Sequence, residues 1–301
     1  MSKTVLVTGG TGFIGQVLCR ELLARGYDLT VLSRQPDDQV KAICGRVKSA
    51  SSLKELESGS GFDAVINLAG EGIADKRWSK ARKKALRDSR ILLTKELVSV
   101  VRGWDHLPEV LVSGSAVGFY GDQGTSTVTE ETSPHDEFTH QLCQDWELAA
   151  RDLEKDGVRV CISRTGVVVG ANGGFLTRMI LPFKLGFGGR LGTGQQFMPW
   201  VHRTDVVQAL IWMLETPSAK GAFNVVSPQP ATNQEFTRQL GKVLHRPTPF
   251  PAPGPILRIA LGEMSRLLLT GQRAIPERLK DADFNFRYTD LSSALEDAIR
   301  G

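Results

Sequence analysis

A chain of 301 residues with 41% apolar side chains is long enough for one large α/β unit with an appended lobe, or for two closely joined domains. Its net charge of +4 at pH 7 is too small to indicate a nucleic-acid partner, and no apolar run reaches the ~18 residues that span a bilayer. Because the start, MSKTVLVTGG, has no signal-peptide pattern and the four cysteines show no CxxC or zinc-type spacing, we expect a cytoplasmic protein with no metal, no membrane and no nucleic acid among its partners.

Strand-like and helix-like segments alternate from the start of the chain. TVLVT (4–8) is a β-branched run, residues 13–25 have apolar side chains at helical spacing, and DLTVLSR (28–34) has the pattern of a second strand. Further strands are predicted at 63–70, 109–115 and 159–170, a short helix at 52–57, and longer helices at 81–101 and 137–155. This repeated βα order predicts an α/β fold with a Rossmann-type, doubly wound parallel sheet.

The composition changes after Gly170. Residues 173–202 are rich in Gly and Pro, a helix is predicted at 204–215 and a strand at 221–227, and RPTPFPAPGP (246–255) has five prolines in ten residues. We therefore predict a sheet domain made of residues 1–165 with 204–230. Residues 166–203 with 231–301 are predicted to form a smaller C-terminal substrate lobe.

A glycine-rich turn, TGGTGFIG (8–15), lies between the first predicted strand and the first predicted helix. In this context the GxxGxxG spacing is typical of dinucleotide binding. Gly9 permits the tight turn, Gly12 lets the backbone approach the phosphates, and Gly15 allows close packing of the helix. The free N–H groups at the start of that helix favour a pyrophosphate. The predicted phosphate contacts are Gly9, Thr11, Gly12, Phe13, Ile14 and Gly15.

The end of the second predicted strand indicates which dinucleotide binds. A carboxylate there would bind the adenosine ribose hydroxyls and repel a 2′-phosphate, but this chain has Ser33 and Arg34. A hydroxyl with a guanidinium can hold a phosphate by charge-assisted hydrogen bonds. The sequence therefore predicts NADP(H) as the cofactor of the 1–165 and 204–230 domain, although Arg34 as an ordinary surface arginine is the alternative.

TGGTGFIG, NLAG (67–70), SGSAVGFYG (113–121) and PWVHRTDVV (199–207) together resemble the extended short-chain dehydrogenase/reductases, which include nucleotide-sugar epimerases. NLAGEGI, DSRI, LCQDWE and GQRAIPERL are similar to the atypical branch called epimerase family proteins, which has a small C-terminal domain of its own. The resemblance covers almost the whole chain. It implies that Leu68, Ala69, Gly70 and Arg90 lie beside the cofactor, that Ser115 is the active-site serine, and that Glu71 contacts the ligand.

The superfamily's catalytic pair, Tyr-x-x-x-Lys, is absent from this sequence. The chain has three tyrosines, and the residues four places later are Val31, Gly124 and Ser292. In the helix that should hold the pair, Leu142 or a neighbour stands in place of the tyrosine, and Trp146 or thereabouts in place of the lysine. The sequence therefore does not predict, beside Ser115, a tyrosine whose pKa is lowered enough to act as a general base.

Other side chains are weaker candidates for the pocket. Tyr120, His140, Trp200 and His202 are the predicted substrate contacts, with packing roles as the alternative for Tyr120 and His140. Arg164 and Arg90 are candidate anion contacts, with a structural ion pair as the alternative for each. The basic run KRWSKARKKALR (76–87) is either the solvated face of a helix or a positive wall beside an anionic ligand.

Two functions agree with these motifs. One is an NADP-dependent oxidoreductase or nucleotide-sugar epimerase with a modified active site acting on a small molecule, which needs a proton donor or acceptor that the sequence does not show. The other is a non-catalytic NADP(H)-binding sensor or regulatory protein, which the missing pair favours. The substrate and the oligomeric state are not indicated by the sequence.

Overall fold

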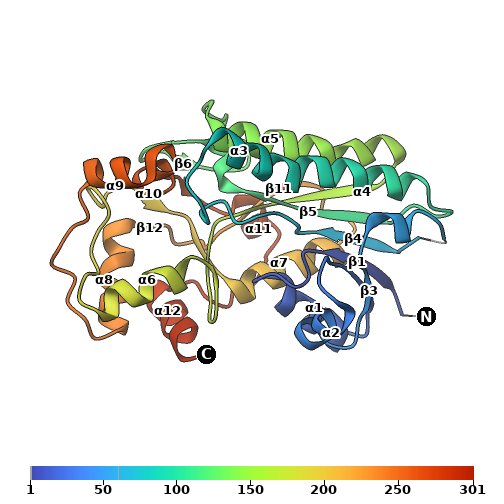
Figure 1. Ribbon diagram of the computed structural model, residues 1–301, viewed down its shortest axis with the longest axis horizontal. Coiled ribbons are helices and arrows are strands. Elements are labelled where there is room, and N and C mark those ends of the chain that lie inside the picture. The colour runs from blue at the N-terminus through green and yellow to red at the C-terminus, as the bar shows by residue number, and fades with distance from the viewer. Residues whose placement is uncertain (1, 60) are drawn as a thin grey trace.

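A seven-stranded parallel sheet forms the centre of the molecule in the computed structural model, which describes residues 2–59 and 61–301 (Figure 1). In spatial order the strands are β11 (Gly221–Val225), β7 (Arg159–Thr165), β5 (Val110–Ala116), β4 (Ala64–Asn67), β1 (Thr4–Thr8), β2 (Asp28–Leu32) and β3 (Lys48–Ala50). The chain runs outward from β1 to β3, then returns to β4 and runs outward on the other side. The order reverses between β1 and β4, where open α/β sheets bind ligands. The predicted doubly wound sheet is confirmed.

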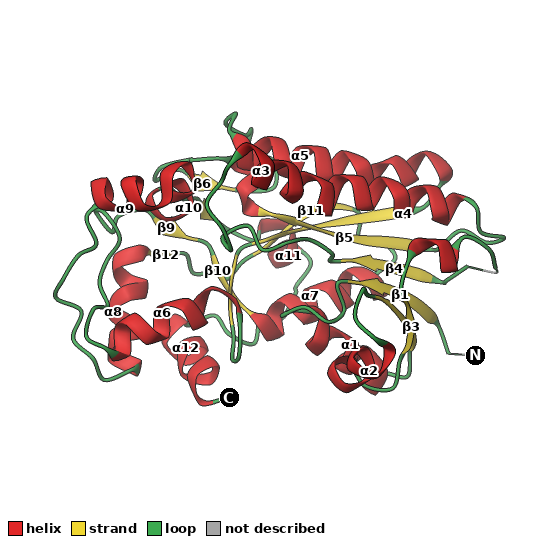
Figure 2. Ribbon diagram, in the orientation of Figure 1, coloured by secondary structure: helices red, strands yellow, loops and turns green. Residues whose placement is uncertain are grey.

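Helices cover both faces of this sheet (Figure 2). Because successive residues of a strand point to opposite faces, Val5 and Val7 belong to one buried cluster and Leu6 to another. The first cluster includes side chains of α1 (Gly15–Ala24), α2 (Asp37–Cys44), α7 (Arg203–Glu215) and α11 (Glu277–Asp281). The second includes side chains of α4 (Leu93–Arg102) and α5 (Phe138–Arg151).

The predicted strand 159–170 is broken at Gly166. Strand β7 ends at Thr165, and β8 (Val167–Val169) leaves the sheet to pair in parallel with β10 (Trp200–His202). A Cβ atom on Gly166 would lie 1.9 Å from the carbonyl oxygen of Pro199. This close approach of two backbones turns the chain away from the sheet and into the second part of the molecule.

The helix predicted at 81–101 is one helical rod with an irregular turn inside it. It consists of α3 (Lys80–Arg87), a π-helical turn (Asp88–Leu92) and α4. The helix predicted at 137–155 is α5 followed by a 3-10 turn (Asp152–Asp156). Further 3-10 turns lie at Leu53–Leu56, Val117–Tyr120 and Gly262–Ser265.

The remaining elements pack beyond the carboxyl ends of the strands. They are β6 (Thr127–Val128), α6 (Gly174–Lys184), β9 (Phe197–Met198), β12 (Ala231–Thr232), α8 (Asn233–Val243), α9 (Gly254–Leu261), α10 (Arg266–Leu269), β13 (Arg273–Ala274) and α12 (Leu291–Arg300). A separate buried cluster, with Leu176, Trp200, Phe236 and Leu295, joins α6, α8 and α12. Among the described residues, none of the helices is both long and apolar enough to cross a membrane.

Candidate functional site

The glycine-rich turn follows β1 and opens α1. Gly9 has φ +70°, and a Cβ atom there would lie 2.7 Å from the backbone of Leu68. A Cβ atom on Gly15 would lie 2.2 Å from the Gly9 carbonyl oxygen. Within the described chain no side chain caps α1, and its first turn has no acidic residue. The N–H groups of Gln16, Val17 and Leu18 donate to backbone carbonyl oxygens of the turn. Those of Phe13, Ile14 and Gly15 have no hydrogen-bond partner among the described residues and are available to an anion.

Phe13 connects this turn to the second part of the molecule. Its ring atoms lie within 2.5–3.3 Å of the Cβ positions that Gly173 and Gly174 lack. The guanidinium carbon of Arg203 lies 4.6 Å from the centre of the same ring. The turn and the start of α6 are therefore packed together through one aromatic side chain. Ile14, at the start of α1, packs against the buried cluster that includes Val5 and Val7.

The end of β2 presents Ser33 and Arg34 at the surface. Ser33 Oγ accepts a hydrogen bond from the Gln35 N–H at 3.2 Å. Arg34 is exposed and takes part in no ion pair within residues 2–59 and 61–301. A guanidinium with no carboxylate beside it can donate hydrogen bonds to an anion. This is the arrangement expected where a 2′-phosphate binds.

The end of β4 is fixed against the glycine-rich turn. Thr8 Oγ1 donates to Asn67 Oδ1 at 2.6 Å, and the Ala69 N–H donates to Thr8 Oγ1 at 3.2 Å. Gly70 follows, and a Cβ atom there would lie 3.0 Å from the Arg90 guanidinium carbon. The structure thus brings the predicted residues Leu68, Ala69, Gly70 and Arg90 together beside Gly9.

Arg90 lies in the π-helical turn and has no carboxylate partner in the described parts of the chain. Its Nη2 donates to the Glu71 carbonyl oxygen at 2.7 Å, and its guanidinium carbon lies 5.3 Å from the centre of the Trp146 ring. Burial lowers the pKa of this guanidinium. The Glu71 carboxylate pairs with Arg82 instead. A partly buried cation whose hydrogen bonds go to neutral groups can still bind an anion. The role of Arg90 as an anion contact stays a prediction.

Ser115, Glu147 and Arg164 form one buried network. Ser115 lies opposite Arg164 in the register of β5 and β7. Its Oγ donates to Glu147 Oε1 at 2.7 Å, and Arg164 binds both carboxylate oxygens at 2.9 Å. Burial alone would lower the pKa of Arg164, but the hydrogen bonds that Arg164 donates to the Glu147 carboxylate raise it. Arg164 is only 5% exposed, so its guanidinium forms the structural ion pair rather than the predicted anion contact.

On the helix where the Tyr/Lys pair was expected, the residue that contacts Ser115 is Glu147, one position beyond Trp146. The Glu147 carboxylate accepts a hydrogen bond from the Ser115 hydroxyl, and Cys143 precedes Glu147 by four residues, the spacing of Tyr-x-x-x-Lys. Burial raises the pKa of the Cys143 thiol to about 12. The i,i+4 spacing could have identified these two residues, but only the position of Ser115 in space fixes the register.

Tyr120 and His140 are buried, and neither lines the cavity that opens beyond β5 and β7. Tyr120 is fully buried, and its hydroxyl donates to Asn224 Oδ1 at 2.7 Å while accepting from Arg164 Nη1 at 2.9 Å. Burial raises the pKa of Tyr120 to about 12. His140 Nδ1 lies 2.7 Å from the Phe119 carbonyl oxygen. The packing alternative is thus the one that the structure supports for both.

Trp200 and His202 are both buried, and neither is among the described residues that line the cavity beyond β5 and β7. The Trp200 indole N–H donates to the Gln229 carbonyl oxygen at 3.0 Å. His202 caps α7, because its Nδ1 accepts from the Thr204 N–H at 3.3 Å. Asp205 instead accepts the N–H groups of Arg287 and Tyr288, at 2.7 and 3.0 Å.

A cavity of about 810 Å³ opens where β5 and β7 end. Cys143 and Thr165 line it on the sheet side, and Phe175, Met198 and Leu268 line it on the other side. Its charged lining residues are four acids and two bases: Asp75, Asp136, Glu137, Glu263, Arg178 and Arg266. Two ion pairs, Asp75 with Arg178 and Glu137 with Arg266, cross its rim. No histidine or tyrosine is among the described residues that line it.

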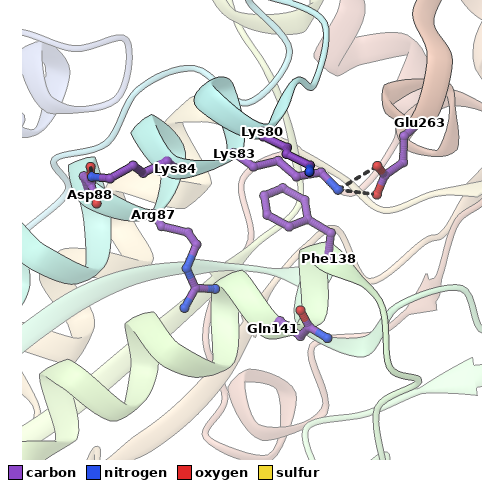
Figure 3. Close-up of a pocket in the computed structure, with 8 residues that line it drawn as sticks. All are labelled: Lys80, Lys83, Lys84, Arg87, Asp88, Phe138, Gln141 and Glu263. Atoms are coloured by element: carbon purple, nitrogen blue, oxygen red, sulfur yellow. Dashed lines mark hydrogen bonds and ion pairs between the residues drawn. The ribbon is translucent and has the colours of Figure 1, made fainter.

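The basic run forms one side of a separate, shallower hollow of about 560 Å³ (Figure 3). Its cations come from α3; Lys83 reaches Glu263 directly, and the Phe138 ring lies beside Lys83 (Figure 3). Lys83 Nζ lies 2.6 Å from a Glu263 oxygen, Lys84 pairs with Asp88, and Arg87 pairs with Asp145. Because acidic side chains take up these charges, the run is the solvated face of a helix rather than a positive wall.

The reversed strand order, the glycine-rich turn and the uncapped start of α1 define a Rossmann-type nucleotide-binding protein. The model of the NAD dependent epimerase/dehydratase family matches residues 5–226, and a domain of unknown function, DUF1731, matches residues 252–298. The chain therefore belongs to the NAD-dependent epimerase/dehydratase family.

Several proteins resemble it over their whole length. Epimerase family protein Mb2239 of Mycobacterium bovis is 39% identical over 98% of this chain and 97% of that protein. Epimerase family protein SSP1921 of Staphylococcus saprophyticus is 38% identical over 99% of each. Human epimerase family protein SDR39U1 (isoform 2), crystallised with NADPH, is 35% identical over 99% of each chain, with a TM-score of 0.89.

Proposed function

We propose that this protein binds NADP(H), with the pyrophosphate at the start of α1 and the adenosine 2′-phosphate at Arg34. The observation that carries the proposal is the exposed guanidinium of Arg34, free of ion pairs in the described chain, directly after the end of β2. An acidic residue there would favour NAD(H) instead. The human relative crystallised with NADPH supports the same cofactor.

The nicotinamide end of such a cofactor would lie toward Ser115 and the cavity, and the residues there lack the usual proton-transfer apparatus. Cys143 keeps its proton at neutral pH because burial raises its pKa to about 12. The Glu147 carboxylate is engaged by Ser115 and Arg164. The function that this arrangement supports best is binding of NADP(H) together with a small organic molecule, without proton abstraction of the Tyr/Lys type.

The charge of the cavity argues against a nucleotide sugar as that small molecule. Four carboxylates and two guanidiniums line it, and both guanidiniums pair with carboxylates. A nucleoside diphosphate would bring additional negative charge into this acidic space. A neutral or cationic, largely apolar molecule fits the lining better.

A second candidate function is an NADP(H)-dependent oxidoreductase. The opening of the cavity at Cys143 and Thr165 favours it, because a substrate carbonyl could approach the nicotinamide there. The Cys143 thiol would then serve as a proton donor rather than as a base.

One experiment separates these functions. NADPH binding is measured by calorimetry. NADPH oxidation is then followed with a panel of neutral carbonyl compounds, and NADP⁺ reduction with a panel of nucleotide sugars, whose hydroxyl groups can only donate hydride. Binding without turnover is the expected result. NADPH oxidation that falls at least about tenfold in Cys143→Ala, but not in the buried control Cys161→Ala, would establish the oxidoreductase. Reduction of NADP⁺ by a nucleotide sugar would contradict the assignment of the cavity.

A further inference from the structure

Helix α9 is apolar but buries none of its side chains. Its sequence is GPILRIAL, and Ile256 and Ile259 are 61% and 80% exposed. These two residues are three positions apart and so lie on the same face of the helix. In a globular protein an apolar helix face normally packs against the core. An apolar helix left in water therefore indicates a surface that something else covers.

Neighbouring segments extend this apolar surface. Leu181, Leu185, Phe187 and Phe250 are 63–76% exposed. The segments that hold them are joined, because the Ala252 N–H donates to the Arg190 carbonyl oxygen at 2.8 Å. Six of the nine large apolar side chains that are exposed in the described chain thus belong to one region, the lobe end surface: Leu181, Leu185, Phe187, Phe250, Ile256 and Ile259. Figure 1 shows this region at the end of the long axis farthest from the N-terminus.

The charges around the lobe end surface all have the same sign. Five exposed cations lie in the same segments: Lys184, Arg190, Lys242, Arg246 and Arg258. None of them takes part in an ion pair with a described residue. The segments 173–192 and 242–261 contain no Asp or Glu. The lobe end surface therefore combines exposed apolar side chains with positive charges that no carboxylate of the same two segments offsets.

We propose that the lobe end surface docks on an anionic membrane surface. Apolar side chains that project from a short helix and from turns enter the headgroup region, while Lys and Arg bind anionic lipid. A second copy of the chain fits poorly, because a symmetric contact would place the same cations against each other. The contact is a surface contact, which is compatible with the absence of a membrane-spanning helix among the described residues.

Docking at this surface would place the cavity wall next to lipid. Helix α6 contributes Phe175 and Arg178 to the cavity and Leu181 to the lobe end surface, and Leu185 follows directly after the helix. A largely apolar ligand would therefore have only this helix and its neighbours between the bilayer and its binding site.

The test is sedimentation of the full-length protein with vesicles of phosphatidylcholine alone or with about 30% phosphatidylserine. We expect sedimentation with the anionic vesicles only, decreasing as salt is raised. The double variant I256S/I259S removes side chains that bury nothing and should lower the vesicle-bound fraction at least about tenfold. The charge variant K242E/R258E should do the same. The matched controls Leu148→Ser and Lys95→Glu, exposed on the opposite part of the molecule, should bind as the unchanged protein does.

Three results would overturn the proposal. They are no binding to anionic vesicles at low salt, equal binding by I256S/I259S and by Leu148→Ser, and a stable dimer in analytical ultracentrifugation that I256S/I259S abolishes. The last result would assign the lobe end surface to a second copy of the chain. Circular dichroism of each variant checks that the fold is intact.

Discussion

Glu147 lies on the helix where the sequence was expected to hold a Tyr/Lys pair, and its contacts limit what the site can do. A lysine beside Ser115 would add a positive charge and lower the pKa of a neighbouring tyrosine. Glu147 instead accepts a hydrogen bond from the Ser115 hydroxyl and neutralises Arg164. The serine is therefore oriented toward a carboxylate and not toward a proton acceptor in the cavity.

The Glu147 and Arg164 pair should be important for stability. Both side chains are nearly inaccessible, at 4% and 6% exposed. Arg164→Met leaves a buried carboxylate without a counter-charge and should lower the free energy of unfolding by about 3–5 kcal/mol. Urea denaturation measures this. The control Arg151→Met breaks an exposed pair with Glu154 and should cost less than about 1 kcal/mol. Equal losses in both variants would refute the structural role of Arg164.

At the scale of elements, the glycine-rich turn depends on contacts that no side chain can replace. In Gly15→Ala the new Cβ atom would lie 2.2 Å from the Gly9 oxygen and 2.7 Å from the Gly10 Cα, both backbone atoms. We expect the free energy of unfolding to fall by about 1–3 kcal/mol, and NADPH affinity to fall more than about tenfold, because the turn must shift.

Gly103→Ala is the matched control for this variant. Gly103 has φ −85°, and its Cβ atom would lie 3.4 Å from the nearest atom, the Val100 oxygen. Neither NADPH affinity nor stability should fall in this control. If Gly15→Ala bound NADPH as tightly as the control, the proposed position of the pyrophosphate would be wrong.

The cap of α7 should make stability depend on pH. Burial lowers the pKa of His202 from 6.5 to about 4, although Asp297 opposes this shift. The unfolded chain takes up a proton near pH 6.5 and the folded protein does not, so stability is complete above pH 6.5 and decreases as the pH falls toward 4. We expect this group to contribute a loss of about 1–3 kcal/mol.

His202→Asn provides the comparison, because asparagine also accepts an N–H bond at a helix start but does not titrate. Urea denaturation at several pH values between about 7.5 and 4.5 should show a smaller acid loss in the variant. The same acid loss in both proteins would mean that other groups determine it.

At the scale of the whole molecule, the sequence predicted the sheet and the place of the glycine-rich turn well because both depend on local patterns. Alternating strands and helices defined the sheet, and the glycine spacing defined the turn. The break at Gly166 was missed because it comes from the approach of Pro199, which is distant in sequence. Helix α6 was missed because the Gly and Pro residues around it, Pro182 included, hide its apolar periodicity.

The far end of the site could not be predicted for a similar reason. Whether Trp200, His202 and Tyr120 face the cavity or the core depends on how the second part packs on the sheet. The i,i+4 spacing of Cys143 and Glu147 was visible in the sequence, but choosing it over Leu142 and Trp146 required the position of Ser115.

The molecule also joins its two parts through charged contacts around the cavity rather than through one apolar interface alone. Asp75 pairs with Arg178, Lys83 with Glu263 and Glu137 with Arg266. Exposed pairs of this kind contribute little stability individually.

The central claim is that Arg34 selects NADP(H), and calorimetric titration with NADPH and NADH tests it most directly. The unchanged protein should bind NADPH at least about tenfold more tightly than NADH, and Arg34→Ala should remove that difference. The exposed control Arg238→Ala should keep it. A protein that ignores NADPH, or that prefers NADH with Arg34 intact, would contradict the account.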